Sequence, residues 1–257
     1  MIGKRRLRLL MPWLATIFLL TVWELACWAL RIDRTVLPAP SLIVKSLLQY
    51  PAAIAHHSLQ TLYTTVVGFG LAIVTGMLIG LAIGASSLVY AGLYPLLIAF
   101  NSVPKVALVP ILVIWFGIGT VPAILTAWVI SFFPIVVNVA TGLATIEPEM
   151  RDVLRSLGAS RWQILTKVGI PRSMPYLFGS LKIAITLAFI GSVISETVAG
   201  NEGIGYMMLS ASAKPDTPLV FSGLIVISIM GVLMYAVCAW IERHVTGWAV
   251  RGGDLVA

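Results

Sequence analysis

The chain has 257 residues, of which 59% are hydrophobic and 11% are charged, and its mean hydropathy is +1.00. Soluble domains carry about 25% charged residues, so this composition excludes an ordinary soluble protein. The net charge of +7 would also suit a nucleic-acid binder, but the basic residues fall between long apolar runs, as in cytoplasmic membrane-protein loops, and we expect no nucleic-acid partner.

The apolar runs predict an all-α integral membrane protein with one transmembrane domain over residues 1–257. A helix needs about 20 apolar residues to cross the hydrocarbon core, and the runs lack the alternating pattern of barrel strands. The basic start MIGKRRLRLL leads into a run that is longer than a signal-peptide core and has no A-x-A-like cleavage site, so we expect an uncleaved span. The six predicted spans cover about residues 9–30, 59–84, 93–116, 120–141, 176–195 and 218–241.

The distribution of Lys and Arg predicts the orientation of these spans. With a cytoplasmic N-terminus, twelve basic residues fall in the inner segments and four in the outer ones. This excess indicates that both termini are cytoplasmic. The inner residues are Lys4, Arg5, Arg6, Arg8, Arg151, Arg155, Arg161, Lys167, Arg172, Lys182, Arg243 and Arg251, and the outer ones are Arg31, Arg34, Lys45 and Lys214.

The second span carries a small residue at every fourth position: Ala72, Gly76, Gly80 and Gly84. Such a ridge lets another helix approach closely. Two interpretations remain open for it, namely packing within one subunit and contact between two copies.

The third span is interrupted by Pro95, Pro104 and Pro110, each of which removes a backbone donor. In lipid such breaks are tolerated where neighbouring protein or a water-filled cavity satisfies the freed carbonyls. This leaves two interpretations, a kinked helix packed in protein with a snorkelling lysine, and a segment that lines a solute path. The path candidates are Asn101, Ser102, Pro104 and Lys105, together with Glu196 at the outer end of the fifth span.

No catalytic or metal site is predicted. Cys27 and Cys238 lie inside apolar runs as buried thiols, and the three histidines are too scattered to bind zinc. A membrane enzyme would need ionisable groups converging at one depth. Those near the spans (Glu24, Lys105, Lys182 and Glu196) form no such cluster, and we expect Lys182 to snorkel to the inner face.

Residues 147–172 form a charged segment between the fourth and fifth spans, with eight charged residues. Their insertion would cost over ~20 kcal/mol at ~2.5–3.5 kcal/mol each, so the segment must lie in the cytoplasm. Apolar residues recur there every three or four positions, which predicts two short helices with Gly158 between them. Ser160 is expected to cap the second helix and Pro171 to end it. Periodicity alone suits either a helix lying on lipid or one docked in a partner's groove.

The spacing of particular residues in this segment resembles the cytoplasmic-loop motif of binding-protein-dependent ABC importer permeases. The matching positions are Asp152, Val153, Leu154, Gly158, Val168, Ile170 and Pro171, with Asp in place of the usual Glu and Val-Leu in place of Ala-Ala. The resemblance extends over nearly the whole chain and is greatest to the nitrate/sulfonate/taurine branch. The stretches that carry it are LPAPS (37–41), SVPKVALVPILVIWFGIG (102–119), LGASRWQ (157–163) and SETVAGNEGIGYMM (195–208).

The resemblance implies the fold of a type I ABC importer permease and a multi-pass location in a bacterial inner membrane. It further implies a second permease copy, usually identical, an ABC ATPase dimer that binds ATP and Mg, and a periplasmic or lipid-anchored solute-binding protein. The chain itself is expected to bind no cofactor and to be no enzyme, because its only Gly-Lys pair, Gly3-Lys4, is followed by Arg5 and forms no phosphate loop. The implied ATPase-coupling residues are Asp152, Gly158, Ala159, Ser160, Arg161, Trp162, Val168, Ile170 and Pro171.

Branch membership and Lys105 together favour a small anion as the solute: a sulfonate, taurine or nitrate. A neutral heterocycle such as a thiamine-precursor pyrimidine is the alternative within the same transporter class. A secondary carrier is disfavoured by the coupling motif, and a membrane enzyme by the lack of a cluster of ionisable or nucleophilic residues in the sequence.

Overall fold

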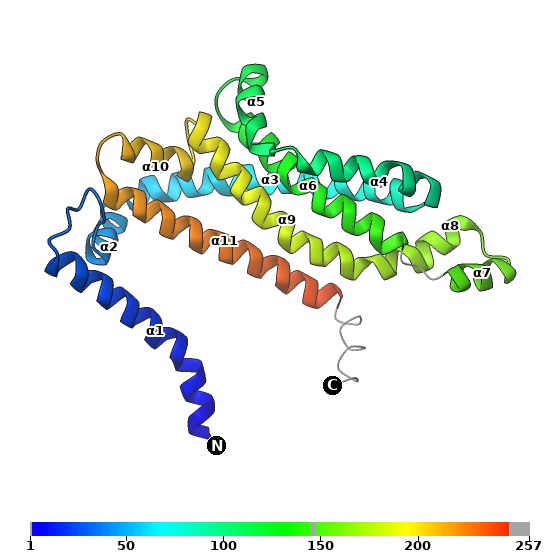
Figure 1. Cartoon of the computed structure of the whole chain (residues 1–257), viewed down its shortest axis with the longest axis horizontal. Helices are drawn as coiled ribbons and strands as arrows, with labels where there is room; N and C mark the ends of the chain where they lie inside the picture. Colours follow the sequence, from blue (N-terminus) through cyan, green and yellow to red (C-terminus); the bar gives the residue numbers. More distant parts are fainter. Residues whose placement is uncertain (1, 145–147, 247–257) are drawn as a thin grey trace.

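The computed structural model describes residues 2–144 and 148–246, and these residues form helices and connecting turns with no strand. Figure 1 shows most of the long helices side by side along the long axis, with α7 and α8 at one end and α2 and α10 at the other. The helices are α1 (Ile2–Ala29), α2 (Pro40–Gln49), α3 (Pro51–Gly84), α4 (Ser87–Ser102), η1 (Lys105–Leu108), α5 (Val109–Phe116), α6 (Thr120–Ala144), α7 (Pro148–Ser156), α8 (Arg161–Ile164), η2 (Leu165–Gly169), α9 (Ile170–Ala199), α10 (Ile204–Ser212) and α11 (Thr217–Val245).

The small-residue ridge of α3 packs against α6 within the same chain. A β-carbon added at Gly76 would lie 2.9 Å from Cβ of Ile135, and one added at Gly84 would lie 2.8 Å from Cβ of Leu143. The partners advance along both helices in the same direction and with the same offset, so α3 and α6 run parallel. Of the two interpretations of the ridge, the structure supports packing within one subunit.

Helix α9 completes the core by running antiparallel to α6. A β-carbon at Gly191 of α9 would lie 3.1 Å from the carbonyl oxygen of Thr126, and one at Gly142 of α6 would lie 3.0 Å from Cβ of Ser173. Small residues on both helices thus allow backbones to approach closely, which is how membrane helices associate without a hydrophobic driving force. The centre of this three-helix core contains Ala72, Ile135, Val139, Leu177 and Ala184.

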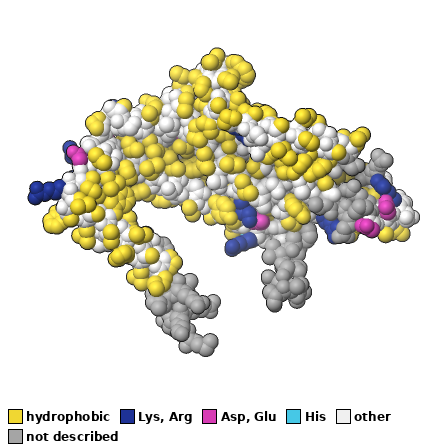
Figure 2. Space-filling model, viewed as in Figure 1, with side chains coloured by type: hydrophobic (Ala, Val, Ile, Leu, Met, Phe, Trp, Pro, Cys, Tyr) yellow, Lys and Arg dark blue, Asp and Glu magenta, His cyan; other side chains and the backbone are white. Residues whose placement is uncertain are grey.

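Within the described ranges, four helical stretches are long and apolar enough to cross a membrane: Pro51–Gly84, Thr120–Ala144, Trp162–Ala199 and Thr217–Val245. The predicted third span is a bent pair, Leu88–Ser102 and Lys105–Phe116, with a 76° angle between its halves. The apolar part of α1 in the described residues, Leu14–Ala29, is shorter than these. The structure therefore gives four spans, or five with the bent pair, and the count of six stays a prediction. Figure 2 shows apolar side chains over most of the body and charged ones in a few groups, at both ends and at the lower edge near its middle.

Two ionisable groups near the spans have polar partners on other helices. Glu24 of α1 accepts hydrogen bonds from the backbone N–H and the hydroxyl of Ser41, at 3.0 and 2.7 Å, and so caps the start of α2. Lys182 of α9 forms an ion pair with Glu242 of α11, with Nζ and Oε2 2.7 Å apart. That Lys182 snorkels to the inner face stays a prediction, and the structure adds that a carboxylate on the neighbouring helix lies within its reach.

Candidate functional site

The charged segment folds as two short helices joined at a glycine, as its periodicity predicts. Gly158, between α7 and α8, has φ +83°, a conformation that favours glycine. Ser160 caps the second helix, because its hydroxyl accepts from the backbone N–H of Gln163 at 3.2 Å. The side chain of Gln163 in turn accepts from the N–H of Ser160 at 2.8 Å. These two reciprocal bonds form a capping box.

The second helix does not end at Pro171, so that expectation was wrong. Helix α8 passes through the π-helical turn η2 directly into α9, and the stretch Trp162–Ala199 is continuous. The N–H of Ile170 bonds to the carbonyl of Leu165, five residues back. Pro171 lies in the first turn of α9, where its missing N–H costs little. The charged segment is therefore joined rigidly to the fifth predicted span.

The segment presents apolar side chains to its surroundings. The residues Val153, Leu157 and Trp162 are 59%, 78% and 70% exposed. Beside them a hollow of about 310 Å³, lined in part by Gly158 and Ala159, lies between the two short helices. Exposed apolar side chains around a hollow are typical of a docking surface.

The other predicted coupling residues lie around the same segment. Asp152 is exposed and lies 3.5 Å from Arg155, measured between Oδ1 and Nη1. Val168 lines the hollow, whereas Ile170 and Pro171 are half-buried at the start of α9. The side chain of Arg161 lies outside the described part of the chain, as do residues 145–147.

The predicted path residues Asn101, Ser102, Pro104 and Lys105 gather at the bend of the third predicted span. The Nζ of Lys105 donates to the side-chain oxygen of Asn101 at 2.7 Å and to its backbone carbonyl at 3.1 Å. The same Nζ lies 5.5 Å from the ring centre of Phe133 on α6. Lys105 is half-buried, whereas Asn101, Ser102 and Pro104 are exposed. This arrangement satisfies the backbone carbonyl of Asn101 near the end of α4 and places one cationic group beside the break.

Glu196 does not join this group in the structure. It is 2% exposed and accepts hydrogen bonds from Thr61 at 2.8 Å and Thr64 at 3.2 Å, both on α3. The sequence analysis did not predict that Thr61 and Thr64 bond to Glu196, although the spacing of polar residues on the two helices indicates such contacts. Polar residues recur at the same helical spacing on both spans, which predicts facing polar stripes. They are Thr61, Thr64 and Thr65 on α3 and Ser192, Ser195 and Glu196 on α9.

A parallel pair of apolar helices, a third antiparallel to it and an exposed two-helix segment at one end together define a helical, multi-pass membrane fold. The chain belongs to the family described as binding-protein-dependent transport system inner membrane component, whose model matches residues 68–247.

Similarities to individual proteins support this membership. The formylaminopyrimidine transport permease protein ThiX of Halalkalibacterium halodurans is 30% identical, over 95% of this chain and 98% of its own length. The taurine transport system permease protein TauC of Escherichia coli is also 30% identical, over 90% of this chain and 86% of its own. Other relatives are named for aliphatic sulfonates, nitrate and riboflavin. A chain of the MetNI methionine ABC transporter in an inward-facing conformation shares the fold, with a TM-score of 0.65, 22% identity, and coverage of 75% of this chain and 96% of that chain.

Proposed function

We propose that this chain is the translocation subunit of an ATP-driven importer that carries a small anion, such as a sulfonate, taurine or nitrate, across a bacterial inner membrane. The observation that carries the proposal is the exposed two-helix segment around Gly158. It offers apolar side chains and a hollow to a partner while its second helix continues into the membrane body. Movement of a partner bound there would be transmitted along α9.

The proposed partner at this segment is an ABC ATPase dimer, which would bind the ATP and Mg. Each ATPase subunit would receive one segment, and two copies of the permease would form the path between them. A solute-binding protein, periplasmic or lipid-anchored, would deliver solute on the opposite side. The family description supports the binding-protein partner, since its members work in binding-protein-dependent systems.

The proposed path runs past Asn101, Ser102, Pro104 and Lys105. A lysine beside a broken membrane helix is energetically costly and usually marks a functional site, and its positive charge favours an anionic solute. The names of the relatives support two classes of solute, since they include taurine as well as formylaminopyrimidine. A neutral pyrimidine is therefore the second candidate, and it would leave the charge of Lys105 without a role in selection.

The test is uptake by proteoliposomes that contain the permease with its ATPase and its binding protein. We expect uptake of radiolabelled taurine, nitrate or an alkanesulfonate that requires ATP inside and binding protein outside. Unlabelled formylaminopyrimidine should not compete. Competition by the pyrimidine alone would replace the anion with the second candidate, and uptake without ATP would exclude an ATP-driven importer.

A further inference from the structure

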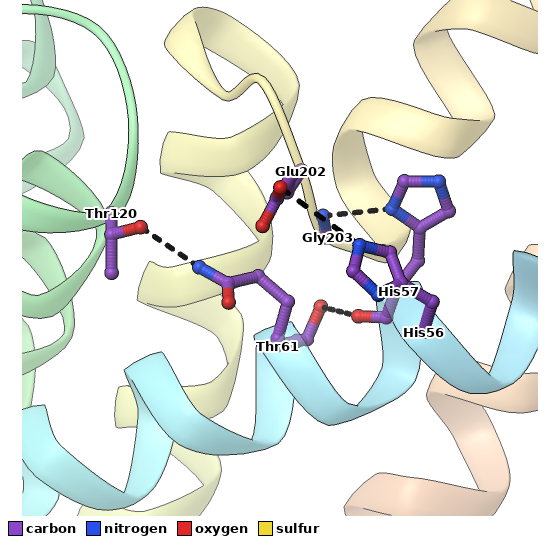
Figure 3. A network of polar contacts seen from close by, with 7 residues as sticks. His56, His57, Thr61, Thr120, Glu202 and Gly203 are labelled. Atoms are coloured by element: carbon purple, nitrogen blue, oxygen red, sulfur yellow. Dashed lines mark hydrogen bonds and ion pairs between the residues drawn. The ribbon is translucent and has the colours of Figure 1, made fainter.

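At the end of the molecule opposite the coupling segment, the first turn of α10 is capped by side chains from other helices. Helix N-termini leave backbone N–H groups without partners, and the residue before the helix usually supplies a side chain to satisfy one of them. That residue here is Gly203, which has no side chain. Its own N–H donates instead to Nδ1 of His57 on α3, at 3.1 Å, a contact shown in Figure 3.

The next two N–H groups are satisfied in the same way. Ile204 donates to the hydroxyl oxygen of Thr61 at 2.9 Å, and Gly205 donates to Oε2 of Glu196 at 3.3 Å. Three successive amides of one helix start are thus held by α3 and α9.

Glu196 is the centre of this cap. Thr61 donates to one of its oxygens at 2.8 Å, and Thr64 and Ser192 lie 3.2 and 3.4 Å from the other. No ion pair to Glu196 occurs within residues 2–144 and 148–246. A carboxyl group surrounded by hydroxyl and amide donors is suited to hold elements together by hydrogen bonds.

Two glycines allow the loop to approach Glu196. A β-carbon at Gly203, where φ is +103°, would lie 2.2 Å from the carboxyl carbon of Glu196. One at Gly205 would lie 2.4 Å from the backbone oxygen of Val193 on α9. The absence of side chains at these two glycines therefore allows the backbone of residues 203–205 to pack directly against the carboxylate.

The turn before α6 is attached to the same ends of α3 and α9. The N–H of Gly119 donates to the carbonyl of Ala199 at 3.1 Å. Gln60 donates to the hydroxyl of Thr120 at 2.9 Å, and Thr120 is labelled in Figure 3. Helix α5 leads from the bend at Lys105 into this turn. The segment that carries the proposed path and the start of α10 are therefore both bonded to the same ends of α3 and α9.

We propose that Glu196 is a positioning residue, which together with Thr61 and His57 seats α10 across α3 and α9 so that these three helices move as one body when this end of the permease opens. The opening step rests on the proposed function, whereas the seating of α10 does not. Separation of the helices would leave buried donors and acceptors without partners, which is unfavourable, most of all for the carboxylate. In this proposal Glu196 acts through α10.

The seating is tested by hydrogen–deuterium exchange of the 203–205 amides, measured on the full chain in lipid nanodiscs. Thr61→Val and Glu196→Ala each remove a partner of these amides, so exchange should accelerate at least about tenfold. Two matched variants serve as controls. Among the residues that the structure describes, the hydroxyl of Thr65 bonds only the carbonyl of Thr61 in its own helix, and the buried hydroxyl of Ser195 has no hydrogen-bond partner. Thr65→Val and Ser195→Ala should leave exchange at 203–205 unchanged.

Glu196→Gln separates positioning from charge. The amide oxygen of Gln can accept from Gly205, and the hydroxyls of Thr64 and Ser192 can turn to accept from its NH₂ group. We expect this variant to keep slow exchange and wild-type uptake in proteoliposomes, whereas Glu196→Ala loses both. Unchanged exchange in Glu196→Ala would overturn the proposal. So would a Gln variant with slow exchange but no uptake, because the charge would then be what matters. If the wild-type complex itself shows no ATP-driven uptake, the proposed function fails and the exchange data still decide the seating.

Discussion

Gly80 of α3 lies so close to α6 that a β-carbon there would be 2.8 Å from Cβ of Val139. The backbone oxygen of Val136 would be only 2.9 Å away. Real β-carbons do not approach other atoms so closely, so any side chain at Gly80 must push the two helices apart. The close approach of these parallel helices is what keeps the core of the permease together.

Gly80→Ala should therefore destabilise the protein. Overpacking of this kind costs about 1–3 kcal/mol, and the backbone oxygen cannot rotate away as a side chain can. The measurement is the free energy of unfolding in mixed micelles with increasing SDS. Gly70→Ala on the same helix is the control, since a β-carbon at Gly70 meets nothing within 4 Å. Equal stability of the two variants would show that α3 and α6 are not in close contact.

The local features of the coupling segment could be predicted from sequence. Gly158 and the cap at Ser160 depend on residues within a few positions of one another, and the structure confirms both. Pro171 shows where local reasoning fails, because a π-helical turn just before it lets the helix continue.

Partners far apart in the sequence could not be predicted in the same way. Lys182 and Glu242 are 60 positions apart, and their pairing depends on how α11 packs beside α9. The network around Glu196 likewise needs the register between α3 and α9. The spacing of Thr and Ser residues indicates a polar face on each helix, but not which residue meets which.

The opposite placement of the coupling segment and the loops around α2 and α10 predicts a labelling pattern. Single cysteines at Ser156 and Ala159 should react with membrane-impermeant maleimide only from the cytoplasmic side. Cysteines at Asp33 and Asp216, before α2 and α11, should react only from outside. Right-side-out and inside-out vesicles provide the two tests, and blocking with a permeant reagent is the control. Labelling of both pairs from one side would contradict the predicted orientation.

Lys105→Met should lower the rate of uptake strongly while the complex still assembles. The variant keeps the length of the side chain but removes the charge that is bound to Asn101 and available to an anion. We expect at least about a tenfold loss, equivalent to 1.4 kcal/mol. Lys45→Met is the control, because Lys45 is an exposed lysine of α2 away from the bend. Full uptake by Lys105→Met would mean that Lys105 serves only to cap the end of α4.

The segment around Gly158 is where the permease is proposed to receive the energy of ATP hydrolysis. Driving a two-state change from 1:99 to 99:1 takes a differential of about 5.5 kcal/mol. Gly158→Asp forces a side chain into the positive-φ conformation, at a cost of about 1–3 kcal/mol, and adds a negative charge at the docking surface. Ser156→Asp adds the same charge two positions earlier, where the backbone is helical. The control therefore separates the shape of the turn from its charge.

The decisive measurement is the amount of ATPase that copurifies with an affinity-tagged permease from membranes that contain both proteins. The wild-type chain and Ser156→Asp should retain the ATPase, and Gly158→Asp should lose most of it while being inserted in the membrane at the wild-type level. Full retention of the ATPase by Gly158→Asp, together with undiminished ATP-driven uptake, would contradict the assignment of this segment as the ATPase docking site.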